Sequence, residues 1–391
     1  MTAPSRIAFV CPRFAEGTAP GGAETLLKAL ALRLRRSGTA VTFLATCATD
    51  HFTWENTIPA GTREVDGITV KTFPVDQRDT RLFHRIQDSL CRGRRISHAD
   101  ERRWLDNGVH SQALYRHLQE KGDCYDRIVA GPYLFALTHA VARLAPDKTV
   151  LAPCLHDEPF ARLECVRELF AIVRRTMFNT RTEQKLAERL FGYPSERGAV
   201  VGIGMDAFEA SSEAALPLHG LRIPYLIYCG RREPMKGTPL LLDYFSTFCE
   251  RTGRELGLVL TGSGPVRIPA AQRARIKDLG FVAEQEKRDL MAGALAFCHP
   301  STYESLGIVL LESWLAGAPV LVKAQGEALR DQCRQSGGGL WFANYPEFEE
   351  ELLLLMDQPD LARTLAQRGR SYVQESYSWD RVEQRLLEAL A

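Results

Sequence analysis

Short, β-rich apolar runs alternate with stretches of helical periodicity along nearly the whole chain, and this alternation constrains the fold most. In the first half we expect strands over residues 7–11, 41–46, 68–73, 127–130, 150–154, 176–179 and 199–201. In the second half we expect them over residues 225–229, 257–261, 295–299, 320–322 and 340–342. Strands separated by helices form parallel sheets covered by those helices. The pattern therefore predicts an α/β fold.

A change of composition divides this pattern into two parts. Residues 207–224 contain serine, proline and glycine and have little periodicity, so we interpret them as a linker. We expect a Rossmann-like domain over residues 1–206 and a second one over 225–377. Two doubly wound domains of this size are expected to face each other across a cleft, with ligands at the carboxyl ends of the strands.

Composition excludes several classes of protein. The chain has 391 residues, enough for two or three domains, and its 49 Lys+Arg against 48 Asp+Glu do not favour nucleic-acid binding driven by overall charge. Its apolar runs are too short for a membrane span, and the first one, residues 7–11, is too short for a signal-peptide core. The ten cysteines show no Cys-x-x-Cys spacing, which favours reduced thiols in a cytoplasmic protein.

An arginine-rich insertion at about residues 76–123 does not fit the regular pattern. Seven arginines lie between Arg81 and Arg103, against Asp88, Asp100 and Glu101. One interpretation is a solvated helical excursion, because charged runs usually face water. The other is a basic surface that meets an anionic acceptor or the inner face of a membrane.

A basic loop follows the strand expected at residues 225–229. Arg231 and Lys236 stand five residues apart in this loop, bracketed by glycines. A guanidinium fork and an ammonium at the end of a strand suit a diphosphate. An ordinary exposed loop is the alternative. The Gly-Ser-Gly at residues 262–264, after the next strand, permits close approach of a ligand but also fits any tight turn.

Two acidic residues flank the start of a later helix. Glu304 precedes the helix, Glu312 lies two turns further on, and Gly307 falls in the first turn, where free amides hold phosphate. Glu312 stands among apolar residues and needs partners, which the vicinal hydroxyls of a ribose would supply. The alternatives are that Glu312 pairs with a core arginine and that Glu304 caps the helix.

These motifs in this order resemble the retaining glycosyltransferases of family 4, the glycosyl transferases group 1, which have the GT-B fold. The motifs are Gly-Arg-x-x-x-x-Lys-Gly at 230–237, Gly-Ser-Gly-Pro at 262–265 and Pro-Ser-x-x-Glu-Ser-Leu-Gly-x-x-x-x-Glu at 300–312. The resemblance covers nearly the whole chain. It departs at Leu306, where the family usually has Phe, and at Arg232, where the family usually has an apolar residue.

The resemblance implies roles for residues in both halves. It implies that the donor is bound by Gly21, Gly22, Arg231, Lys236, Phe281, Val282, Glu304, Ser305, Leu306, Gly307, Ile308 and Glu312. Catalysis would fall to His156, Glu304, Arg231 and Lys236, with His156 contacting the transferred sugar. A flexible turn at Gly21 and Gly22 and a structural role for His156 are the alternatives. The family also implies that a terminal helix over 378–391 packs back on the first domain.

The implied activity is transfer of a hexose, with retention, from a nucleoside diphosphate sugar to an acceptor hydroxyl, in polysaccharide or glycoconjugate synthesis. The acceptor is a glycan, a lipid-linked sugar or a small molecule. The resemblance implies no metal or other cofactor, and the chain has no Asp-x-Asp. The alternatives are an epimerase or hydrolase on the same fold, or a non-catalytic partner subunit. The nucleotide base, the sugar, the acceptor and the oligomeric state stay open.

Overall fold

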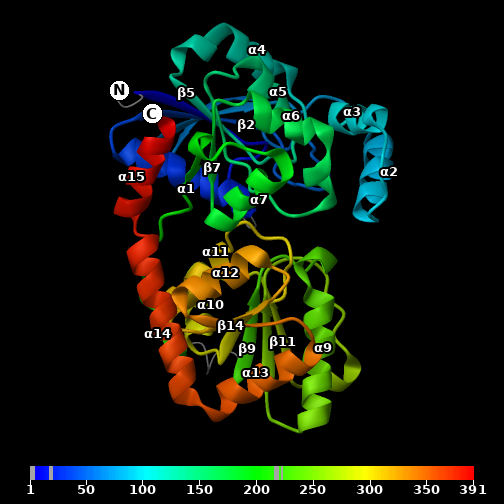
Figure 1. The fold of residues 1–391 in the computed structure, drawn as a ribbon, viewed down its shortest axis with the longest axis vertical. Coiled ribbons are helices and arrows are strands. Elements are labelled where there is room, and N and C mark those ends of the chain that lie inside the picture. Colours follow the sequence, from blue (N-terminus) through cyan, green and yellow to red (C-terminus); the bar gives the residue numbers. More distant parts are fainter. Residues whose placement is uncertain (1–4, 17–20, 215–219, 222) are drawn as a thin grey trace. The chain divides into compact units, whose positions relative to one another are not determined.

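The chain divides into two compact units (Figure 1). Unit 1 comprises Met1–Gly204 with Trp379–Ala391, and unit 2 comprises Met205–Ser378. The computed structural model describes residues 5–16, 21–214, 220–221 and 223–391. Residues 215–219 and 222 of the expected linker lie outside the described residues, as do residues 17–20 just before the expected glycine loop.

Unit 1 contains an eight-stranded sheet in the order β3-β4-β2-β1-β5-β6-β7-β8. Every adjacent pair is parallel except β3 with β4. Its strands are β1 Arg6–Val10, β2 Ala40–Thr46, β3 Gly61–Val65, β4 Ile68–Phe73, β5 Arg127–Ala130, β6 Thr149–Leu151, β7 Arg175–Phe178 and β8 Gly198–Val200. Its α-helices are α1 Gly22–Arg36, α2 Thr80–Cys91, α3 His98–Asp106, α4 Gln112–Lys121, α5 Ala136–Leu144, α6 Glu164–Ile172, α7 Arg181–Phe191 and α15 Trp379–Leu390.

Unit 2 contains a six-stranded parallel sheet in the order β11-β10-β9-β12-β13-β14. Its strands are β9 Tyr225–Cys229, β10 Gly257–Thr261, β11 Ile276–Gly280, β12 Ala296–His299, β13 Val320–Lys323 and β14 Gly339–Phe342. Its α-helices are α9 Thr238–Thr252, α10 Glu284–Ala292, α11 Ile308–Ala316, α12 Glu327–Ser336, α13 Tyr345–Asp357 and α14 Pro359–Ser376. The prediction of two parallel α/β sheets is confirmed.

The local sequence explains most of these elements. Strands β9 and β10 are buried along their whole length, as expected for interior strands of a parallel sheet covered on both faces. Helix α1 buries four leucines along one face. At the start of α7, the Thr180 hydroxyl accepts from the backbone N–H of Glu183 at 3.1 Å, and Gly192 ends the helix in the left-handed conformation.

Two strands were not predicted, and both lie at an edge of their sheet. Strand β3 has no fully buried residue, and β11 buries only Ile276. An edge strand lacks the continuous apolar run that marks an interior strand, so the sequence carries little signal for either.

The arginine-rich insertion forms α2, α3 and α4. The apolar side of α2 and α3 joins a core cluster through Ile86, Leu90, Trp104 and Leu105. The seven arginines from Arg81 to Arg103 are all exposed, and both helices lie at one edge of unit 1 in Figure 1. The segment is therefore a helical excursion anchored by its apolar side.

Helix α15 packs within unit 1 rather than unit 2. A Cβ on Gly204 would lie 2.1 Å from the Trp379 ring, so the glycine leaves room for this indole. Arg33 of α1 holds Glu383 at 2.5 Å and Asp380 at 3.0 Å. The chain thus returns to its first unit at its end.

Candidate functional site

The strand order of unit 2 creates a switch point between β9 and β12. These strands are neighbours, but the chain leaves β9 towards β10 on one side and leaves β12 towards β13 on the other. Ligands of open α/β sheets bind where the order reverses in this way. Lys236 follows β9 and Glu304 follows β12, so the topology brings the two expected motifs to one place.

Lys236, Glu304 and His299 make contact at this switch point. Lys236 Nζ lies 2.6 Å from Glu304 Oε1, and His299 Nε2 lies 3.1 Å from the same oxygen. The side chains of Lys236 and Glu304 are 22% and 15% exposed, and that of His299 is 7% exposed. Within the described part of the chain, both contacts use Oε1, which leaves Oε2 for a ligand.

The two partners determine the charge state of Glu304. Burial by itself would raise the pKa of this carboxyl, but Lys236 and His299 together hold the pKa well below its usual range. Glu304 is therefore a carboxylate at neutral pH. The Lys236 ammonium can bind an anionic group of a ligand, and the Glu304 carboxylate can accept hydrogen bonds from hydroxyl groups of the same ligand.

Gly237 permits the close approach of the two loops. Its φ is +77°, and a Cβ there would lie 2.5 Å from the carbonyl oxygen of Pro300. The β9 loop therefore lies directly against the start of the loop that carries Glu304. Gly307 has a similar role at the start of α11, because its φ is +78° and a Cβ would lie 2.4 Å from Leu329 Cδ2.

The two adjacent arginines of the β9 loop lie in different environments. Arg231 is 40% exposed and pairs with Glu233 at 3.1 Å. Arg232 is buried, pairs with Asp278 at 2.5 Å and donates to the carbonyl oxygen of Gly264 at 3.0 Å. Arg232 stands where the family usually has an apolar residue. Its contacts join the loop after β9 to the loop after β10 and to strand β11.

Glu312 pairs with Lys287, a partner that was not predicted from the sequence. Lys287 Nζ lies 3.1 Å and 3.2 Å from the two Glu312 oxygens, and both side chains are 16% exposed. Burial raises the pKa of Glu312, and Lys287 opposes that rise. Lys287 also contacts Glu284 at 2.9 Å, in the first turn of α10. The partner is therefore a lysine of α10 and not the core arginine considered above.

The other expected donor-binding residues of unit 2 lie at the same edge of its sheet. Ser305 and Leu306 are buried just before α11, and the helix itself begins at Ile308. The first amides of a helix have no partner within it and favour anions. Phe281, 57% exposed, and the half-buried Val282 follow β11 directly.

In unit 1, His156 follows β6 and belongs to a chain of hydrogen bonds. Its Nδ1 lies 3.3 Å from Glu158 Oε1, and the Tyr133 hydroxyl donates to the same oxygen at 2.7 Å. Glu158 is only 4% exposed. These contacts orient the imidazole. The role of His156 towards a sugar stays a prediction.

Gly21 and Gly22 stand at the start of α1, beside a buried ion pair. Glu24, in the first turn of α1, contacts Arg13 at 2.6 Å, and a Cβ on Gly21 would lie 2.2 Å from Glu24 Oε2. Arg13 also donates to the carbonyl oxygen of Thr49 at 2.8 Å. The absence of a side chain at Gly21 therefore leaves room for the Glu24 carboxylate. A role of this loop towards a diphosphate stays a prediction.

Neither a metal-binding cluster nor a membrane-spanning helix occurs among the described residues. They contain no group of three or more His, Cys, Asp or Glu side chains arranged to hold a metal ion. Among the same residues, no helix combines the length and the apolarity that crossing a bilayer requires.

Known proteins resemble the chain in sequence. Residues 219–372 match the family model described as glycosyl transferases group 1. A D-inositol 3-phosphate glycosyltransferase of Salinispora arenicola is 31% identical over 284 residues, covering 64% of this chain and 62% of the relative. One of Kribbella flavida is 24% identical and covers 94% and 90%. The chain spans 42%, 62% and 59% of the first three curated relatives it matches.

Solved structures resemble the chain over almost its whole length. Sucrose-phosphate synthase from Thermosynechococcus elongatus superposes with a TM-score of 0.73 at 16% identity, covering 98% of both chains. Anabaena HepE, solved in complex with UDP and glucose, superposes with a TM-score of 0.71 at 18% identity, covering 99% of both. The fold is GT-B, as expected. The sequence match thus places residues 219–372, most of the second unit, in the glycosyl transferases group 1 family.

Proposed function

We propose that this protein is a retaining glycosyltransferase that moves a hexose from a nucleoside diphosphate sugar to an acceptor hydroxyl, in polysaccharide or glycoconjugate synthesis. The observation that carries the proposal is the contact of Lys236 with Glu304 at the switch point of unit 2. The relatives named as glycosyltransferases and the complex of HepE with UDP and glucose support it.

Each part of the donor has a group suited to its chemistry. Arg231, Lys236 and the Gly307 and Ile308 amides at the start of α11 bind the diphosphate, because they supply cations and free N–H groups. Glu312 accepts hydrogen bonds from the ribose hydroxyls. The backbone near Phe281 and Val282 contacts the nucleotide base of the donor.

The proposed transfer depends mainly on stabilising the leaving group, and it uses no nucleophile from the protein. The bond from the anomeric carbon to the β-phosphate oxygen breaks, and a bond from that carbon to the acceptor oxygen forms on the same face. The acceptor proton passes to the leaving phosphate oxygen. Negative charge grows on the β-phosphate, and Arg231, Lys236 and the α11 amides stabilise it. Glu304 and His156 position the sugar through its hydroxyls. No metal or other cofactor takes part.

We also propose a cytoplasmic location, with peripheral contact of the α2–α3 arginines at the inner face of a membrane. Exposed arginines near an anionic surface gain about 1 kcal/mol each. Sedimentation with anionic and with neutral vesicles tests this contact. Replacing Arg94 and Arg95 by Gln should lower binding to anionic vesicles only, and equal binding to both vesicle types would contradict it.

The first test is donor binding. A thermal-shift panel of UDP-, GDP-, ADP- and TDP-sugars should single out one nucleotide, because a ligand at 100 times its Kd adds about 2.7 kcal/mol of stability. Lys236→Ala should then abolish transfer, whereas Lys277→Ala, an exposed lysine on β11, should not. Unchanged transfer by the Lys236 variant would refute the role of this residue.

Product analysis separates the rival activities. An epimerase would yield an isomeric donor without an acceptor, and a hydrolase would release free sugar. A non-catalytic partner would bind the donor and transfer label to no acceptor.

A further inference from the structure

The Arg232 side chain joins three strand ends of unit 2 that are far apart in the sequence. Its Nη2 lies 2.5 Å from Asp278 Oδ1, and its Nη1 donates to Asp278 Oδ2 at 3.1 Å. The same Nη1 donates to the carbonyl oxygen of Gly264 at 3.0 Å. One guanidinium therefore fixes the loop after β9 to the loop after β10 and to strand β11.

Backbone contacts between the same loops strengthen this junction. The N–H of Arg232 donates to the carbonyl oxygen of Ser263 at 2.8 Å, and the N–H of Gly262 donates to the carbonyl oxygen of Gly280 at 2.7 Å. A Cβ on Gly262 would lie 2.1 Å from the carbonyl oxygen of Gly230, so the loops after β9 and β10 are in direct backbone contact. A shift of one of these loops must therefore move the other.

Asp278 extends the junction to the segment that is expected to contact the nucleotide base. Its Oδ1 also accepts from the N–H of Gly280 at 3.0 Å. The pairing of β11 with β10 is irregular between Asp278 and Gly280, where one residue of β11 is skipped. Such irregularities redirect the chain that follows and are frequent beside active sites. Phe281 and Val282 come directly after this point, so the Asp278 carboxylate helps to set their direction.

Stability alone does not explain a charge at this position. The Arg232 side chain is 5% exposed and that of Asp278 is 30% exposed. Arg232 Nε is buried and has no hydrogen-bond partner among the described residues. Burying a charge is costly, and an apolar side chain, which the family usually has here, is often equally stable or more stable in place of a buried ion pair. A bidentate pair does, however, fix one relative geometry of its two partners.

We propose that Arg232 is a positioning residue for the nucleotide base. Through Asp278 it holds residues 281–282 in the geometry that distinguishes one base from another. The inference rests on the proposed function, in which the backbone of this segment contacts the base of the donor. Arg232 itself does not touch the donor. It therefore determines the preference among nucleotides, whereas its neighbour Arg231 acts on the diphosphate.

Calorimetry with the full chain and with UDP, GDP and ADP tests this role, because these probes share ribose and diphosphate and differ only in the base. In the wild type one of them should bind at least about tenfold more tightly than the other two, a difference of about 1.4 kcal/mol. The double variant Arg232→Leu, Asp278→Asn removes the ion pair without leaving an unpaired charge, and it keeps an oxygen for the N–H of Gly280. This variant should bind the three nucleotides equally. Inorganic pyrophosphate, which has no base, should bind wild type and variant with the same Kd.

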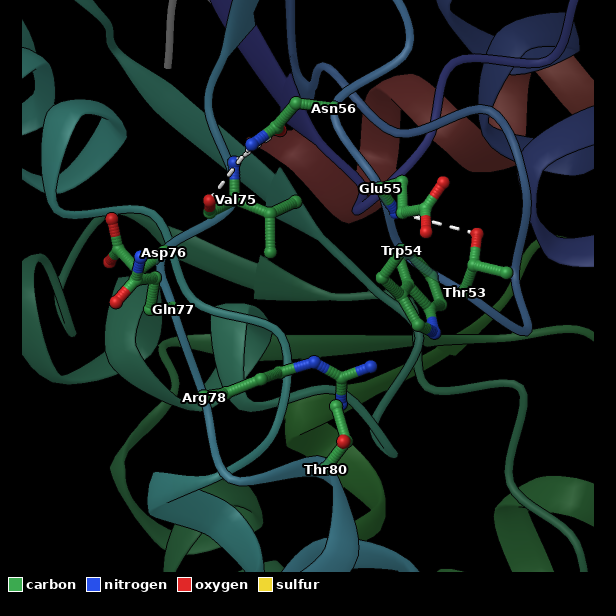
Figure 2. A pocket seen from close by; sticks show the side chains of 9 residues that line it. All are labelled: Thr53, Trp54, Glu55, Asn56, Val75, Asp76, Gln77, Arg78 and Thr80. Carbon is green, nitrogen blue, oxygen red and sulfur yellow. Dashed lines mark hydrogen bonds between the residues drawn. The ribbon is translucent and has the colours of Figure 1, made fainter.

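Two further variants separate positioning from general damage to the protein. Arg232→Lys keeps a cation beside Asp278 but loses the bidentate geometry, so its preference should lie between those of wild type and double variant. Arg78→Leu removes a half-buried arginine of unit 1, which lines a pocket of about 450 Å³ together with Trp54 and Asn56 (Figure 2), and it should leave the preference intact. If the double variant does not fold, Arg232→Lys decides, and a wild-type preference in it then overturns the proposal.

The remaining outcomes distinguish this role from the proposed function. An unchanged preference in the double variant, or equal binding of the three nucleotides by the wild type, overturns the role of Arg232. An equal loss of affinity for pyrophosphate and for the preferred nucleotide also overturns it, because Arg232 would then act on the diphosphate. In transfer assays the donor KM of the double variant should rise while kcat stays that of the wild type. A wild type that binds no nucleotide more tightly than pyrophosphate counts against the proposed function itself.

Discussion

Replacing Lys236 by Met tests the central contact of the site. The change removes the ammonium and keeps most of the apolar stem, so it isolates the charge. Glu304 then stays buried, with His299 as its remaining ion-pair contact among the described residues. The variant should be less stable in unit 2, because an uncompensated carboxylate is left at the switch point.

The size of this effect follows from the burial of the pair. Removing one partner of a buried ion pair costs about 3–5 kcal/mol. The two side chains keep 22% and 15% exposure, and His299 still contacts Glu304, so we expect the low end, about 3 kcal/mol. Lys277→Met, at an exposed position on β11, should stay within about 0.5 kcal/mol of wild type.

The effect should depend on pH in a definite direction. The folded-state pKa of Glu304 is depressed, so its stabilising contribution is fully present above the unfolded pKa of about 4.3. That contribution is lost as the pH falls through the folded pKa. The gap in stability between wild type and Lys236→Met should therefore be largest near pH 7 and shrink below about pH 4.3.

Hydrogen exchange of the β9 and β12 amides in the full chain measures the opening free energy of unit 2 by itself. A double-mutant cycle with Glu304→Gln completes the design, and we expect a coupling of about 2 kcal/mol between the two positions. Additive effects, or a gap that does not change with pH, would show that the contact does not carry this energy.

Three further predictions concern other parts of the chain. Gly237→Ala should destabilise unit 2 by about 1–3 kcal/mol more than Gly253→Ala. Both glycines have positive φ, but only Gly237 lies against Pro300. Equal losses of opening free energy in the two variants, measured by hydrogen exchange, would contradict this. Burial raises the pKa of Glu183 to about 8, so stability should fall as pH rises from about 4.3 to 8, and urea unfolding of Glu183→Gln should lose that slope. Arg33→Ala should speed hydrogen exchange in α15, because it removes the contacts to that helix, and unchanged exchange there would refute it.

The sequence predicted the interior of the fold better than its edges. The bounds expected for β9 and β10 agree with the structure, because interior strands are continuous apolar runs. Strands β3 and β11 carry no such run and were missed. The motif spacing also placed Arg231, Lys236, Glu304 and Glu312 in loops or helices at strand ends, where the structure has them.

Partners were less predictable than positions. His299 was not singled out, although it is the last residue of its strand and lies five residues before Glu304. The pairing of Lys287 with Glu312 was not predicted either. The sequence of α10 is that of an ordinary charged helix, and only its packing against α11 shows which of its charges meets Glu312.

The sequence alone determined the class of fold and the chemical character of the strand-end loops. Both depend on local properties: the period of apolar residues, and the residue types that follow each strand. Only the tertiary structure decided which charges meet. The order β11-β10-β9-β12-β13-β14 makes β9 and β12 neighbours and so joins Lys236 to Glu304 across 68 positions of sequence. Strand order is a property of long-range packing, and no local pattern encodes it.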